Sequence, residues 1–138
     1  MSLCMAGVVL LTGCYTKLAV NFGNGTGEKI RVNSAYTGQD VQIAPNKSKK
    51  IPHCSGDLIV TSSTSEKFSF PNVSLLGHDM DDSYLDKRVS IFGPGYMTLN
   101  VVLETNMELH VLPPGKKGLA ADVKQPSGYP KRGERTSQ

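Results

Sequence analysis

The densest group of side chains able to do chemistry lies in the segment 77–86. It contains His78 and, close behind it, Asp79, Asp81 and Asp82. Carboxylates on a flexible loop suit Ca²⁺, which takes roughly six to eight oxygen ligands. The segment lacks both the Asp-x-Asp-x-Asp-Gly order and the distal Glu of an EF-hand loop. We therefore expect a solvated acidic loop that needs no cofactor. The alternative is a metal site formed by Asp79, Asp81 and Asp82.

Cysteine and histidine are the other residues that could carry a reaction. His53 and Cys54 are adjacent, and neighbours in a strand point to opposite faces, which is poor geometry for a Cys-His nucleophile pair. His110 is a third candidate base, on a segment that also alternates like a strand. No serine lies in a nucleophile elbow, and no Cys/His spacing matches a zinc site. We expect no catalytic residue, and a small buried Cys54.

The apolar run 5–11 ends in Leu11-Thr12-Gly13-Cys14. A short apolar run followed by small residues is typical of an export signal. Leu11-Thr12-Gly13-Cys14 resembles the lipobox of bacterial lipoprotein precursors, which is an aliphatic residue, a small residue, Gly or Ala, and then Cys. In that family the thiol receives a diacylglyceryl group, the peptide is cut before the Cys, and the new amino group is often acylated.

The resemblance implies a signal peptide over 1–13 and lipidation at Cys14, with fatty acids such as palmitate as the membrane anchor. Tyr15, rather than Asp, would follow the lipidated residue, which implies sorting to the outer membrane. The residues 1–4 carry no Lys or Arg, unlike most export signals. The alternative is a buried apolar strand containing Cys14, which could then pair with Cys54 in an oxidising compartment.

Residues after Cys14 alternate between apolar and polar nearly everywhere, with Gly, Pro and Asn at the breaks. Alternation of this kind predicts strands. Expected strands include 18–22, 30–32, 41–43, 48–51, 57–62, 68–70, 97–103 and 107–111. No segment has the periodicity of an amphipathic helix. The spacing predicts an all-β fold over 14–112, an antiparallel sandwich or barrel of about eight to ten short strands, in which Leu99, Val101 and Leu109 face the core.

The segment 113–138 differs in composition from the rest of the chain. It holds six basic residues against two acidic ones, whereas the net charge of all 138 residues is +3. It is rich in Pro, Gly and Ser and has few apolar residues, so it cannot offset its ordering entropy by burial. We expect a disordered basic tail that attracts anionic lipid but, lacking interleaved aromatics, does not read nucleic acid.

These observations favour a non-enzymatic lipoprotein that presents a small β-domain at the bacterial envelope. Its partners would be the outer membrane, through Cys14, and an envelope protein that it assists or masks. Bacteria and phages both encode small lipoproteins, so both origins stay open, as does the oligomeric state. One alternative is an envelope hydrolase or metal-dependent enzyme that uses His78 and the nearby aspartates. The other is a soluble β-structural protein with an unprocessed apolar N-terminus.

Overall fold

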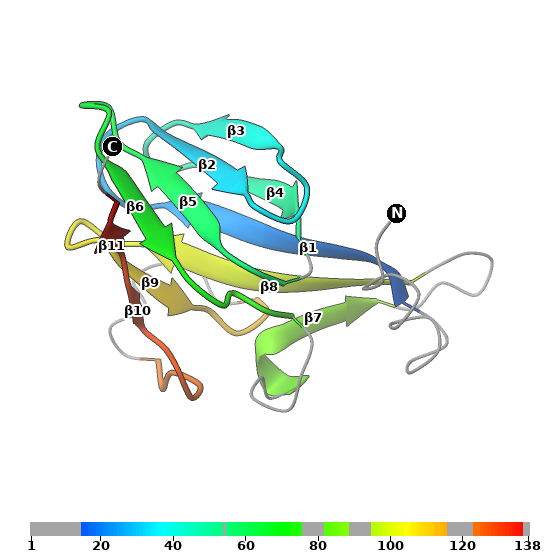
Figure 1. Cartoon of the computed structure of the whole chain (residues 1–138). Helices are drawn as coiled ribbons and strands as arrows, with labels where there is room; N and C mark the ends of the chain where they lie inside the picture. Colours follow the sequence, from blue (N-terminus) through cyan, green and yellow to red (C-terminus); the bar gives the residue numbers. More distant parts are fainter. Residues whose placement is uncertain (1–14, 54, 76–81, 89–94, 116–122, 137–138) are drawn as a thin grey trace.

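Strands in two packed sheets make up nearly all the regular structure of this protein (Figure 1). The computed structural model describes residues 15–53, 55–75, 82–88, 95–115 and 123–136. This part of the chain forms eleven strands and one 3₁₀ turn. The prediction of an all-β fold is confirmed, with a strand count slightly above the expected range.

The first layer, sheet A, has six strands in the order β10-β9-β8-β1-β4, with β7 also paired to β8. Its strands are β1 (Tyr15–Asn24), β4 (Ser48–Pro52), β7 (Leu85–Arg88), β8 (Gly95–Leu103), β9 (Glu108–Val111) and β10 (Lys131–Arg132). β4 is at one edge of this sheet, as its paired lysines predicted. Charged side chains on such an edge discourage pairing with another chain.

The second layer, sheet B, has five strands in the order β11-β6-β5-β2-β3. Its strands are β2 (Ile30–Ser34), β3 (Asp40–Ile43), β5 (Leu58–Thr61), β6 (Lys67–Phe70) and β11 (Glu134–Arg135). Every pairing in this sheet is antiparallel. β5 lies in the centre of the sheet, as its run of three β-branched or aliphatic residues predicted.

One pairing in sheet A departs from the expected antiparallel arrangement. β1 and β8 run parallel, with Val20 opposite Leu99 and Asn21 opposite Asn100. Parallel neighbours need a long crossover between them, and here the strands β2 to β7 supply it. Alternation within a strand says nothing about the direction of its neighbour, so the sequence could not reveal this pairing.

The core lies between the inner faces of the two sheets. In β1 and β8 the buried residues alternate with outward ones, so Val20 and Phe22 are fully buried and Asn21 is not. Leu99, Val101 and Leu109 are buried, as predicted. The core residues are Leu18, Val20, Phe22, Ile30, Val32, Ile43, Ile51, Leu58, Val60, Phe68, Phe70, Val73, Leu75, Leu85, Met97, Leu99, Val101, Leu103, Leu109 and Val111.

The expectation of a disordered tail over 113–138 is wrong for residues 123–136. β10 pairs with β9 in sheet A and β11 pairs with β6 in sheet B, so this segment, the strap, closes one side of the sandwich (Figure 1). Gly133 stands between the two short strands, and its N–H donates to the Met107 carbonyl. Main-chain hydrogen bonds and a few close contacts order the strap. Its polar composition reveals neither the bonds nor the contacts.

The segment 77–86, expected as a solvated acidic loop, is described only from Asp82. A 3₁₀ turn (Asp82–Tyr84) leads directly into β7, so Leu85 and Asp86, expected in the loop, begin a strand that was not predicted. Within the described ranges, no helix is long and apolar enough to cross a membrane.

Candidate functional site

A groove of about 600 Å³ opens on the outer face of sheet A. Its floor is the pair of parallel strands β1 and β8, whose outward positions carry small and polar side chains. This volume is within the range of ligand-binding pockets in proteins. The residues that line it are Asn21, Gly23, Asn24, Gly25, Asn46, Lys47, Ser48, Asp86, Asn100, Val101, Val102, Leu112 and Gly115.

Side-chain amides dominate the polar lining of the groove. Asn21 and Asn100 are register partners on β1 and β8. The side-chain amide of Asn21 donates to the side-chain oxygen Oδ1 of Asn100 at 3.0 Å. An amide has two donors and two acceptor lone pairs, so this bond leaves hydrogen-bonding capacity on both side chains. Lys47 and Asp86 add one charge of each sign to the lining, so the groove favours a polar ligand without strong net charge.

Two glycines keep the floor of the groove bare where β1 runs close to β8. A Cβ at Gly25 would lie 2.8 Å from the Leu103 carbonyl oxygen, and one at Gly23 would lie 3.3 Å from that of Val101. Contacts below 3.0 Å essentially never occur for real Cβ atoms. A larger residue at Gly25 would therefore push β1 away from β8 and distort the groove.

Asn24 holds one wall of the groove in place through its hydrogen bonds. Its buried amide donates to the carbonyls of Glu28 and Ile43, and its oxygen accepts from the N–H and hydroxyl of Thr26. These bonds tie the turn after β1 to sheet B. The role of Asn24 is thus to shape the site, since its side chain is already fully engaged.

A histidine between two carboxylates lies beside the groove. His110 on β9 is the register partner of the groove residue Val102. Its Nε2 is 3.4 Å from Oε2 of Glu104 and 3.3 Å from Oε2 of Glu108. Neither ring nitrogen makes a well-aligned hydrogen bond with a described residue. The His110 imidazole therefore lies between two carboxylate groups at this end of sheet A.

His53, the other described candidate base, is buried in the interior. Its ring is 1% exposed, with Nδ1 2.8 Å from the Ser34 hydroxyl and Nε2 2.6 Å from the Val73 carbonyl. Burial lowers the pKa of His53 below its usual value, although the hydrogen bonds with Val73 and Gly56 and the nearby Asp57 oppose that shift. This histidine joins segments of the fold and cannot reach a substrate.

Most residues singled out in the sequence lie outside the described residues. These are Cys14, Cys54, His78, Asp79 and Asp81. The backbone of Asp82 lies in the 3₁₀ turn, but its side chain is not described. Among the described residues, no group of three or more His, Cys, Asp or Glu side chains is arranged to hold a metal ion.

Asn21 and Asn100 were not singled out in the sequence, because their proximity depends on the parallel pairing of strands 79 residues apart. The sequence contained only a local indication of this pair, since each is a polar residue at an outward position of a long alternating strand.

Comparison with protein-family models, curated proteins and solved structures finds no match to this chain. The groove and the sequence features therefore carry the functional argument alone.

Proposed function

We propose that this protein is a lipid-anchored, non-enzymatic binding module of the bacterial envelope, attached through Cys14. The observation that carries the proposal is the position of Leu11-Thr12-Gly13-Cys14 immediately before β1. Removal of 1–13 would leave the lipidated residue directly next to the first strand of the fold. Two or three acyl chains, at about 0.8 kcal/mol per buried CH₂, hold a protein of this size firmly on a bilayer.

The groove of sheet A is the proposed binding site. Its amides can pair with the alternating donors and acceptors of a polar protein segment, in the way that Asn21 and Asn100 already pair with each other. Few charges line it, so the ligand would be recognised by its hydrogen bonds. The proposed partner is an envelope protein, which this module would assist or mask.

The proposed location is the outer membrane, because Tyr15 and not Asp follows Cys14. By analogy with lipoproteins of enterobacterial type, an Asp at that position would favour retention in the inner membrane. The same reasoning applies to a protein encoded by a bacterium or by a phage that infects it.

Radiolabelled palmitate tests the anchor, and the chain supplies its own controls. Label should enter the wild type and the Cys4→Ser and Cys54→Ser variants, because neither cysteine follows a lipobox. Cys14→Ser should take up no label and should move from the membrane fraction to the soluble fraction or stay as an unprocessed precursor. Label retained by Cys14→Ser, or absent from the wild type, would remove the anchor from the proposal.

A further inference from the structure

A basic and aromatic cluster lies on sheet A, next to the amide groove. The Lys50 ammonium is 5.1 Å from the centre of the Tyr96 ring, and the Arg88 guanidinium carbon is 5.9 Å from it. Both distances are within the range of cation–π attraction. Three strands contribute these residues, since Lys50 is on β4, Arg88 on β7 and Tyr96 on β8. We call these three residues the Tyr96 cluster.

The Tyr96 cluster is at the end of sheet A where β1 begins. Tyr96 is the register partner of Lys17 on one side and of Arg88 on the other. Tyr15 pairs with Gly95, the first residue of β8. Figure 1 shows the start of β1, the start of β8 and the end of β7 at the same end of the molecule. Cys14 is only three residues from Lys17, or roughly 10 Å along an extended chain.

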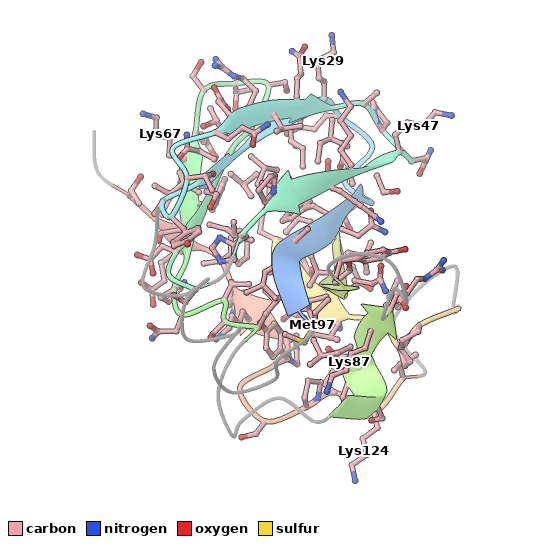
Figure 2. All side chains as sticks on the ribbon, turned by 90° about the vertical axis from the view of Figure 1, so that its right-hand side faces the viewer. Lys29, Lys47, Lys67, Lys87, Met97 and Lys124 are labelled. Carbon is pink, nitrogen blue, oxygen red and sulfur yellow. The ribbon has the colours of Figure 1, made fainter. Side chains whose placement is uncertain are left out.

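The charge of the Tyr96 cluster is positive. Lys50 and Arg88 are exposed, and the neighbouring Lys87 lies at the same end of the molecule as Met97, the residue after Tyr96 (Figure 2). Among the described residues, Asp86 is the acid in contact with the cluster, at 3.7 Å from Arg88. One half-buried carboxylate offsets only part of this charge.

We propose that Lys50, Arg88 and Tyr96 form a surface that binds the phosphate groups of anionic phospholipids beside the anchor. This inference rests on the proposed function, because the anchor at Cys14 is what brings this end of sheet A to a bilayer. Lysine and arginine near an anionic surface are each attracted to it. Tyrosine prefers the level of the lipid headgroups, where its ring is partly buried and its hydroxyl is wet. The cluster supplies both at the place where the bilayer would be.

The test uses the full chain carrying Cys14→Ser, so that the acyl chains contribute nothing to binding. Its partition is measured onto vesicles of phosphatidylglycerol mixed with phosphatidylcholine, and onto phosphatidylcholine alone. In this background, Lys50→Gln with Arg88→Gln is compared with Lys29→Gln with Lys67→Gln. The two pairs lower the net charge equally, and Figure 2 shows Lys29 and Lys67 on the side of the molecule opposite Lys87 and Met97. Melting temperatures confirm that all variants fold.

The substitution of Lys50 and Arg88 should weaken partition onto the anionic vesicles about 30-fold, because each cation usually contributes about 1 kcal/mol. The Lys29 and Lys67 pair should stay within about twofold of its parent, since charges beyond a Debye length are screened. Arg88→Lys should retain binding, because it keeps the charge. Equal losses in both pairs, or no loss in either, would overturn the proposal. The palmitate experiment reports on the anchor independently, so either result can fail alone.

Discussion

His53 and Ser34 form a hydrogen-bonded pair that is buried at the junction of three segments. The histidine follows β4, the serine ends β2, and the second ring nitrogen reaches the carbonyl of Val73. A buried imidazole without these partners would cost free energy, because an unsatisfied polar group loses its hydration. The pair therefore joins the two sheets through polar contacts in a mostly apolar core.

The stability of the fold should depend on pH through His53. Its pKa is lowered in the folded state, whereas in the unfolded chain it is near 6.5. Below about pH 6.5 the unfolded chain binds this proton more readily, so the free energy of unfolding falls as the pH falls, by at most about 1.4 kcal/mol per pH unit. Above about pH 7.5 both states are almost entirely neutral at this site and the contribution is constant.

Urea denaturation of the wild type and His53→Gln between pH 5 and 7.5 measures this effect as a difference, which cancels the other titrating groups. The advantage of the wild type should be largest above about pH 7 and should shrink as the pH falls. Ser34→Ala, which keeps the histidine but removes one partner, should cost about 1–3 kcal/mol and retain the pH dependence. A difference between wild type and His53→Gln that does not change with pH would contradict this account.

From the sequence, His53 could be recognised as a potentially reactive residue, but its structural role could not be predicted. Adjacency to Cys54 was the only information about its surroundings. Its partners lie 19 and 20 residues away, and only the folding of both sheets brings them together. The same limit applies to Asn21 and Asn100, which meet only through the parallel pairing of β1 with β8.

At the scale of elements, the strap shows how two very short strands can order a polar segment. Between β10 and β11 the chain leaves one sheet and enters the other. Tyr129 packs against the core before β10, and burial raises the pKa of its hydroxyl to about 12. On β11, Arg135 lies over the Phe68 ring and 3.3 Å from Glu66. Each contact is small, and together they seal the edge of the sandwich.

Gly133 is the position at which the strap should be most sensitive. A Cβ there would lie 2.8 Å from Cζ of Phe70 and 3.1 Å from Cβ of Phe68. Both belong to core residues that cannot move freely, so Gly133→Ala should destabilise the protein by about 1–3 kcal/mol through overpacking. The neighbouring Glu134→Ala, at an exposed position, should change stability by less than about 0.5 kcal/mol.

Chemical denaturation of both variants provides the measurement, with unchanged m-values as the sign of an unchanged unfolded state. Equal stabilities for the two variants would mean that the strap does not press against Phe70. In that case the segment 123–136 would behave as the composition of the tail originally suggested.

Most of the longer strands could be predicted from alternation, and their bounds agree with the structure to within three residues. The strap could not be predicted, since two-residue strands have no periodicity. The Pro and Gly content of this segment is also typical of disorder. β7 was missed because its four residues follow an acidic loop and two of them are basic. Only pairing with β8 makes it a strand.

At the scale of the whole molecule, the two outer faces of the sandwich differ in character. The face of sheet A carries the groove and the Tyr96 cluster, while that of sheet B presents exposed polar residues such as Arg31 and Gln42. The edge strands β3 and β4 lie next to each other on the side opposite the strap. A partner that binds this protein should therefore distinguish one face from the other.

Site-specific photo-cross-linking in living cells tests that asymmetry. A cross-linking residue at Ser48, exposed on the rim of the groove, should give a discrete adduct, whereas the same residue at Gln42 on the other sheet should not. The adduct at Ser48 should be lost when Asn21→Leu and Asn100→Leu are combined. That double change removes both partners of a hydrogen bond with little change in size, so it should leave stability nearly unaltered.

Adducts of equal strength at both sites would show contact without a preferred face. Persistence of the Ser48 adduct in the double variant would exclude the amides as the recognising groups. Either result would separate the groove from the function of the protein.

The position of β1 has a mechanical consequence. If the chain is held at Cys14, any force on the domain enters along β1, which lies between two neighbours. It is in register with β8 from Tyr15 to Asn24 and with β4 from Ala19 to Gly23. Ladder hydrogen bonds run across the strands, so a pull along β1 loads them together in shear instead of opening them one after another. If Cys14 is the anchor, the strand that follows it would thus resist extraction strongly, and a domain tethered this way should yield under load only when sheet A fails as a unit.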